Sequence, residues 1–477
     1  MFALIVRVGD FYVNAQGALA IQQAVVPDEH RHLGTVVLYS QSSPWTGLLN
    51  PAFSVQQIWL GDVTHDANFL YYYLAGLALK IARHIGLEWG ASVLMLRLIN
   101  VVLGVLVLFT LRRIGRQLRI DEYLVVISVL LFSLTGRFVW QAAGVSYDTL
   151  AILFFVLFVT AAISAIRYAT ATNVLLTMAF AMLGSVTKYV SMPFLGAGAL
   201  AVLAVVIYRA IHDHHQVSVW PPAPSPAARL AMIASSLLFL SAATLFLARI
   251  GGNLLEFGDV QPLCTESYTH EQCMGYDIYA RNYLTMENLK AAAAQGIFPA
   301  AVTPIDYFGY WLDMMYKSLF FYWGRTADWQ PSNIVLSVGS VALAIVAAMA
   351  IAGRRTLPEL PRLFVLGLAA AYSISIFFFN LKTFLKYNQG FAHQGRYFLP
   401  FLGLIFLFVA TRIQSYLQSS RWWRHPVVIY PAVIASILVV AIHSPLVSFF
   451  LYARDNSWYT DFAIQHFGAY LPLKEAS

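Results

Sequence analysis

Long apolar segments recur along this chain, and they constrain its fold more than any other feature. Several approach the roughly 20 residues that a helix needs to cross the hydrocarbon core of a bilayer. Of the 477 residues, 59% are hydrophobic and only 11% are charged, whereas a soluble domain carries roughly 25% charged residues. The low charge excludes a disordered chain, and the many aromatic residues exclude a coiled coil. The sequence therefore predicts an all-α polytopic membrane protein, since barrel strands would be much shorter than these segments.

We predict about eleven transmembrane helices in a single domain that covers residues 1–477. The first segment, Phe2–Val26, is the weakest because it contains Arg7, Asp10 and Asn14, which are costly in lipid. The other predicted spans are Ser92–Leu111, Tyr123–Leu134, Thr149–Ala165, Val174–Val186, Pro193–Ile207, Leu230–Leu247, Ile334–Ile351, Leu363–Phe379, Phe398–Ala410 and Val427–Leu451.

Basic residues gather in one set of short loops between these spans. The set holds 13 basic residues against four acidic ones, so the positive-inside rule places it in the cytoplasm. The same bias accounts for the net charge of +7, which therefore does not indicate a nucleic-acid partner. The amino terminus is then inside and the carboxyl terminus outside. The basic residues are Arg112, Arg113, Arg116, Arg119, Arg167, Arg209, Arg229, Arg354, Arg355, Arg362, Arg412, Arg421 and Arg424.

Two long loops then lie on the outer face, where function is expected to concentrate. The first covers residues 27–91 and the second residues 250–333. The two cysteines of the chain, Cys264 and Cys273, both lie in the second loop. In an oxidising compartment this spacing favours a local disulfide, and two cysteines are too few for a Cys-rich metal site.

Charged residues open the first outer loop, in the run Val26-Pro27-Asp28-Glu29-His30-Arg31-His32. A carboxylate pair at a membrane surface can act as a general base, bind a metal or hold a cationic group. Asp28 and Glu29 equally suit the start of a surface helix, so both interpretations stay open. Further on, the aromatic and amphipathic stretch from His65 to Leu77 predicts a helix that lies in the membrane interface.

Two motifs resemble those of the GT-C glycosyltransferases, integral membrane enzymes that use polyprenyl-phosphate sugars as donors. The first is Val26-Pro27-Asp28-Glu29 with His32, directly after the first predicted span. The second is Gln394-Gly395-Arg396-Tyr397-Phe398-Leu399-Pro400, just before a predicted span. The sequence looks most similar to a poorly characterised bacterial branch with Val-Pro-Asp-Glu-x-x-His and Gln-Gly-Arg-Tyr-x-x-Pro.

The resemblance implies a GT-C-like helical bundle with interfacial helices in the first outer loop. It also implies inverting transfer of a sugar to a glycan, lipid or protein acceptor at the outer (periplasmic) face of a bacterial inner membrane. In the family, the carboxylate after the first span is the catalytic base, and Asp28 matches that position. Glu29 would orient the acceptor or support Asp28. A leaving phosphate does not need the second, acidic carboxyl group of glycoside hydrolysis.

The leaving phosphate needs cations at the outer surface. Lys188 and Arg396 match cationic positions of the family, and Lys382 and Lys386 lie in the same outer loop as Arg396. Asp148 matches a second acidic position, although it also suits an ordinary helix start. Further candidate substrate contacts are His32, His65, Arg137, Gln141 and Tyr397, and in the second loop Tyr276, Asp277, Asp306, Tyr307 and Trp311.

Cofactor and function class are less constrained. Asp28, Glu29, His30, His32 and His65 are possible ligands of a divalent cation, although we expect no essential metal and no other cofactor. A transporter or flippase of a lipid-linked intermediate is an alternative, because charged groups in a membrane bundle also serve substrate paths. A polymerase or ligase of surface polysaccharide is another. Membrane lipids are expected partners in every case.

Overall fold

The computed structural model describes residues 11–13, 19–21, 28–43, 47–212, 225–298, 302–320, 359–391 and 393–419. Within these ranges the chain is almost entirely helical. The exception is a small antiparallel ladder of β1 (Phe11–Val13) and β2 (Leu19–Ile21), in which Tyr12 lies opposite Ala20. The prediction of a helix over Phe2–Val26 is therefore wrong for the residues that are described there. The charged and amide side chains of this segment already made a lipid-facing helix costly.

Six described helical segments are long and apolar enough to cross a membrane. They are α4 (Trp89–Gln117), α7 (Asp148–Tyr168), α9 (Met192–His212) with η2 (Tyr189–Ser191), α10 (Pro226–Phe246) continuing through the π-helical turn η3 (Leu247–Gly251) into α11 (Gly252–Phe257), α17 (Leu360–Tyr387), and η4 (Gly395–Phe398) with α18 (Leu399–Ser419). These helices support a membrane protein. The predicted spans Ile334–Ile351 and Val427–Leu451 lie outside the described residues, so eleven spans stay a prediction.

Two predicted spans have an unexpected form. The segment Tyr123–Leu134 corresponds to α5 (Glu122–Ser133), which is followed after a bend of 65° by α6 (Gly136–Ala143). The pair forms a broken span or a re-entrant loop. The segment Val174–Val186 corresponds to α8 (Ala171–Thr187), which is apolar but shorter than a full span.

α7 is the central helix of the bundle. It packs against α4, α8, α9, α17 and α18, and most of its side chains are buried. Apolar residues occur all round this helix, as expected for a helix that is enclosed by others. The lipid-compatible side chains that remain exposed are found instead on outer helices such as α10, where Leu230, Leu237 and Leu240 are more than half exposed.

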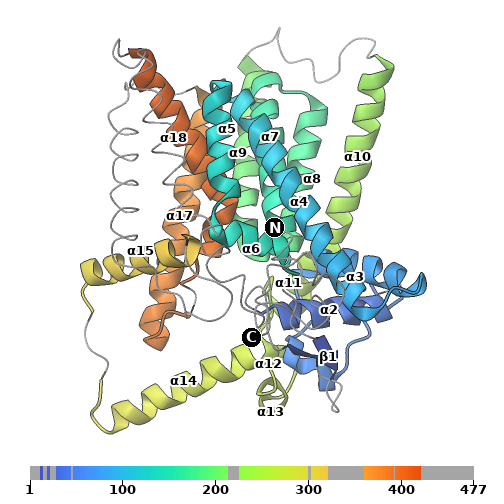
Figure 1. Ribbon diagram of the computed structural model, residues 1–477, viewed down its shortest axis with the longest axis vertical. Coiled ribbons are helices and arrows are strands. Elements are labelled where there is room, and N and C mark those ends of the chain that lie inside the picture. The colour runs from blue at the N-terminus through green and yellow to red at the C-terminus, as the bar shows by residue number, and fades with distance from the viewer. Residues whose placement is uncertain are drawn as a thin grey trace, which may run out of the picture.

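Shorter helices of the outer loops lie at one end of the spans (Figure 1). They are α2 (Glu29–Gln41), η1 (Val55–Leu60), α3 (Phe69–His84), α12 (Cys264–Ser267), α13 (His270–Cys273), α14 (Asp277–Ala294) and α15 (Pro304–Phe320). In Figure 1, α2, α3 and α15 run crosswise to the long helices, and α14 extends away from the bundle. α3 confirms a helix in the stretch from His65 to Leu77, from Phe69 onward, and its place in the membrane interface stays a prediction.

The arginine-rich loops meet at the opposite end of the bundle. Glu359, just before α17, pairs with Arg119 after α4 at 3.4 Å and with Arg167 near the end of α7 at 3.3 Å. Arg362 donates a hydrogen bond to the carbonyl of Leu118 at 2.8 Å. Helix ends that are remote in sequence thus share one surface, which agrees with the predicted grouping of these loops on one side.

Candidate functional site

The site begins at the first turn of α2. Asp28 precedes the helix with φ at +65°, a left-handed conformation that Asp tolerates better than most residues. Its side chain does not cap the helix. Instead, Asp28 Oδ1 accepts a hydrogen bond from Arg31 Nη2 at 2.6 Å, and Oδ2 lies 3.5 Å from Arg396 Nη2. The two sequence motifs, from opposite ends of the chain, therefore meet at this carboxylate.

Electrostatics keep Asp28 ionised. Burial by itself would raise the pKa of this carboxyl, but the charges of Arg31 and Arg396 outweigh burial and hold the pKa well below its usual range. The Asp28 side chain is still 35% exposed, so a ligand is able to reach it. A carboxylate with so low a pKa is a weak base for as long as both arginines hold it.

Glu29 points to a different environment from its neighbour. Its Oε1 lies 2.9 Å from Arg97 Nη2, and both side chains are 0% exposed. The same oxygen accepts the backbone N–H of Val145 at 2.9 Å. Glu29 thus joins α2, α4 and the turn between α6 and α7. From its place in the motif, Glu29 was expected to orient the acceptor or to support Asp28, whereas this geometry favours a structural role. Arg97 was not among the predicted site residues.

A second carboxylate stands at the start of α7. Asp148 Oδ1 accepts a hydrogen bond from Lys188 Nζ at 2.6 Å, and Oδ2 accepts one from the amide of Gln141. Lys188 ends α8, and its ammonium lies over the rings of Tyr397 at 5.0 Å and Tyr147 at 5.7 Å. Two predicted substrate residues, Asp148 and Lys188, are therefore brought together with the closing motif.

Arg137 is the least satisfied side chain of the site. It lies on α6 one turn before Gln141, hence on the same face, and is only 3% exposed. Among the described residues it forms neither a hydrogen bond nor an ion pair, and its buried Nε–H has no acceptor. Arg396, Asp148, Tyr397 and Asp28 are its nearest electrostatic neighbours. A buried polar group without a partner costs about 1–3 kcal/mol, and more when it is charged.

His32 lies between the two carboxylates. Its Nδ1 is 2.7 Å from the Tyr72 hydroxyl, and its ring meets that of Tyr147 edge-on at 5.0 Å. Burial lowers the pKa of His32 to about 4, although Asp28 and Asp148 act in the opposite direction. The imidazole is therefore neutral at pH 7, and it adds no positive charge to the site.

The closing motif is held in place by α15. Gly395 donates its backbone N–H to Ser318 Oγ at 2.6 Å, and a β-carbon at Gly395 would lie 2.6 Å from the backbone nitrogen of Leu319. Only glycine permits this close approach of η4 to α15. Arg396 and Tyr397 follow directly, with the guanidinium 5.6 Å from the Tyr397 ring centre.

The second outer loop reaches the site through a disulfide-bonded segment. Cys264 and Cys273 are joined, which confirms the predicted bridge. Three residues later, the Tyr276 ring lies beneath the Arg31 guanidinium at 5.6 Å and against Gly61. Arg31 is a site residue that was not predicted as one, although it belongs to the first motif. Its position three residues after Asp28 was the signal that both side chains would lie on the same face of α2.

Other candidates lie apart from these residues. His65 pairs with Asp62 at 2.8 Å, and none of its contacts in the described part of the chain involves Asp28. His30 stacks on Trp59. Among the described residues, no group of three His, Cys, Asp or Glu side chains is placed to hold a metal ion. The five proposed metal ligands are thus dispersed, because Glu29 and His65 have other partners.

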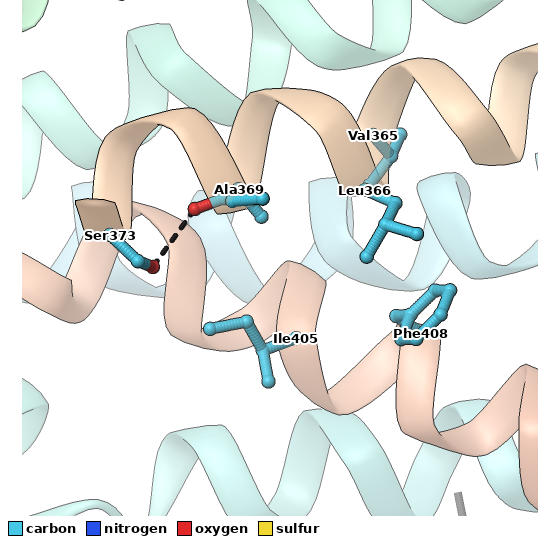
Figure 2. A pocket seen from close by; sticks show the side chains of 7 residues that line it. Val365, Leu366, Ala369, Ser373, Ile405 and Phe408 are labelled. Atoms are coloured by element: carbon cyan, nitrogen blue, oxygen red, sulfur yellow. Dashed lines mark hydrogen bonds between the residues drawn. The ribbon is translucent and has the colours of Figure 1, made fainter. Parts of the chain in front are cut away.

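An apolar recess between α17 and α18 is separate from the site. Figure 2 shows Val365, Leu366, Ala369, Ile405 and Phe408 around it. Its hydroxyl, on Ser373, already donates to the carbonyl of Ala369 at 2.9 Å. The recess therefore offers no polar group that would orient a substrate for chemistry.

We call the charged and aromatic residues around Asp28 the polar cluster. It lies at the end of the spans opposite to the arginine-rich loops, and its members come from α2, α3, α6, α7, α8, η4 and their flanks. Such a set of buried cations beside an ionised carboxylate is suited to bind an oxyanion and to orient a nucleophile. The members are Asp28, Arg31, His32, Tyr72, Arg137, Gln141, Tyr147, Asp148, Lys188, Arg396 and Tyr397.

No family model, curated protein or solved structure matches this chain.

Proposed function

We propose that this protein is an inverting glycosyltransferase that moves a sugar from a polyprenyl-phosphate carrier to a cell-envelope acceptor at the outer face of a bacterial inner membrane. The observation that carries the proposal is the buried Arg137, which has no partner among the described residues and has Arg396 and the ionised Asp28 among its electrostatic neighbours. Phosphate oxygens form strong, often bidentate, hydrogen bonds with guanidinium groups. A membrane-embedded helical bundle suits a donor with a polyprenyl chain.

In this mechanism the donor phosphate binds between Arg137 and Arg396, and Asp28 faces the acceptor hydroxyl. The Arg396–Asp28 separation of 3.5 Å is long for an ion pair, so a phosphate competes effectively for Arg396. As Arg396 turns to the phosphate, its hold on the carboxylate weakens, and the basicity of Asp28 rises. Donor binding thus makes Asp28 a stronger base when the donor is in the site. Lys188 and Gln141 keep Asp148 fixed behind the site.

Mass spectrometry of polyprenyl-linked lipids tests the proposal. Cells that carry Asp28→Asn are expected to accumulate one polyprenyl-phosphate sugar that cells with the unchanged protein do not accumulate. Asp313→Asn is a matched control, because Asp313 is an exposed carboxylate on α15 that pairs only with Lys317 among its described contacts. Unchanged lipids in a folded Asp28→Asn protein would contradict the proposed transfer reaction.

A transporter of a lipid-linked intermediate is the second candidate, and the bend between α5 and α6 favours it. Broken helices are common at the substrate sites of transporters, and Arg137 lies on the short helix that follows the bend. Transfer of a radioactive sugar into lipid or polymer by the purified protein would separate the two. A transporter moves the labelled lipid without changing its covalent structure.

A further inference from the structure

The polar cluster holds more positive than negative charge. Among the described residues its cations are Arg31, Arg137, Lys188 and Arg396, and its carboxylates are Asp28 and Asp148. His32 is neutral, and the nearby Glu29 and Arg97 neutralise each other. Four positive and two negative groups leave a formal excess of two positive charges. Buried charge of one sign is costly unless a counter-charge is bound.

The excess centres on Arg137. Arg31 has Asp28 as its partner at 2.6 Å, and Lys188 has Asp148 at 2.6 Å. Arg396 shares Asp28 with Arg31 from a longer distance of 3.5 Å. Arg137 has no such partner in the described part of the chain, although it is nearly fully buried. It is therefore the guanidinium most open to a second negative charge on a ligand.

We propose that Arg137 makes the polar cluster selective for a phosphate dianion, so that the protein binds a polyprenyl phosphomonoester more tightly than a phosphodiester of the same chain. This inference rests on the proposed function, in which the sugar donor is the diester and the released carrier is the monoester. Arg137 acts as the specificity-determining residue, and Arg396 contacts either form.

The charge of the ligand changes during the proposed reaction. The acceptor oxygen forms a bond to the anomeric carbon, and the bond from that carbon to the phosphate oxygen breaks. Its electron pair stays on the phosphate oxygen, while the proton of the acceptor hydroxyl moves to Asp28. The donor diester carries one negative charge, and the released monoester carries close to two above its second pKa of about 6.

The excess of two positive charges therefore matches the released carrier better than it matches the donor. Interactions that strengthen as negative charge develops on the leaving phosphate lower the barrier of the reaction. The same match retains the released monoester at the site. The protein is thus expected to be inhibited by its own product, the unglycosylated carrier phosphate.

Binding of short isoprenoid phosphates to the purified full-length protein tests the inference. The probes are citronellyl phosphate and its methyl ester, compared by isothermal titration calorimetry at pH 8. The monoester is expected to bind about tenfold more tightly or better, since its second negative charge strengthens the charge-assisted pair that its phosphate forms with Arg137. At pH 5 the monoester is a monoanion, so this preference is expected to disappear, whereas Asp28 remains ionised.

Two variants and one control locate the effect. Arg137→Gln is expected to weaken binding of both ligands, and to weaken monoester binding about tenfold more than diester binding, so that most of the preference is lost. Arg137→Lys keeps the charge and is expected to retain a smaller preference, which covers the case in which the glutamine variant does not fold. Arg113→Gln removes an exposed arginine next to the end of α4, far from the cluster, and should change neither affinity.

The outcomes separate this inference from the proposed function. Equal binding of monoester and diester by the unchanged protein, or a full preference in Arg137→Gln, would overturn the inference and leave the proposed glycosyl transfer standing. Binding of neither probe would overturn both, because the proposed donor would then lack its phosphate site.

Discussion

Asp28 and Glu29 are adjacent carboxylates, yet their burial and their partners differ. Asp28 lies just before α2, is 35% exposed, and pairs with Arg31 and Arg396. Glu29 is turned into the protein and shares a fully buried ion pair with Arg97. A buried pair contributes little net stability, but loss of one partner leaves an uncompensated charge. The two carboxylates therefore differ in what their removal should do.

We expect Glu29→Gln to destabilise the protein by about 3–5 kcal/mol, because Arg97 would be left buried without a counter-charge. Asp28→Asn should destabilise the protein less, since the Asp28 carboxylate and the arginines that it pairs with are all partly exposed, whereas Glu29 and Arg97 are fully buried. The measurement is the apparent melting temperature of both variants in detergent. The double variant Glu29→Gln, Arg97→Gln should recover part of the loss. Equal melting temperatures for the two single variants would rule out the structural role of Glu29.

His32 should make the stability of the protein depend on pH. Burial gives it a pKa of about 4 in the folded protein against an ordinary 6.5, so between these values the unfolded chain takes up a proton that the folded protein does not. This contribution is complete above pH 6.5 and is lost as the pH falls toward 4, by roughly 3 kcal/mol in total. His32→Gln should therefore flatten the decline in apparent melting temperature between pH 7 and pH 4.5. Parallel curves for both proteins would refute this explanation.

Short helices set the geometry of the site at the scale of elements. α6 follows the bend after α5 and presents Arg137 and Gln141 on one face. η4 carries Arg396 and Tyr397 and depends on its close contact with α15. Neither element spans the membrane alone. Each is positioned by long helices on either side, which allows the charged groups to converge without a lipid-facing charge.

Gly395→Ala should displace η4 from α15. The added β-carbon would lie 2.6 Å from the backbone nitrogen and 2.7 Å from the α-carbon of Leu319, and a backbone cannot yield as a flexible side chain does. Overpacking of this kind costs about 1–3 kcal/mol. We expect weaker binding of citronellyl phosphate in calorimetry, since Arg396 moves with η4. Gly309→Ala on α15 meets no atom within 4 Å and serves as the control. Equal binding by both variants would show that the contact does not position Arg396.

At the scale of the whole molecule, charge is divided between the two ends of the helical bundle. One end carries the arginine-rich loops with their exposed ion pairs to Glu122 and Glu359. The other end carries the polar cluster and the crosswise helices. Exposed pairs contribute little to stability, with a median of about 0–1 kcal/mol. Their common location fits a role in fixing the orientation of the protein in the membrane.

Single-cysteine labelling measures this orientation. The two native cysteines form a disulfide, so replacement of both by alanine gives a suitable background. In intact cells, a membrane-impermeant maleimide should label Lys290→Cys on α14 and should label Arg113→Cys only after permeabilisation. Both positions are exposed, so access depends on the side of the membrane. The reverse pattern would place the polar cluster in the cytoplasm.

The sequence alone determined the class of protein, the place of most long helices along the chain and the separation of charge between their two ends. Hydropathy and the positive-inside bias are sums over neighbouring residues, so they can be evaluated without the fold. It also directed attention to Asp28, Asp148, Lys188 and Arg396, since charged residues at span ends are few. The same local sums failed for the part of Phe2–Val26 that is described, Phe11–Val13 and Leu19–Ile21, which forms a ladder and not a helix.

Only the tertiary structure decided how those charges are shared. Lys188 and Asp148 are 40 residues apart, and Glu29 and Arg97 are 68 apart. Side chains that several helices bring together decide which of two adjacent carboxylates is buried. They also decide which arginine has no counter-charge among the described residues. The interaction energy of two charged side chains depends on the distance between them in space and on the local dielectric constant, which changes steeply with burial. For that reason Glu29 was assigned by position to the acceptor while its contacts are structural, and Arg137 is the cation of the site that has no partner among the described residues.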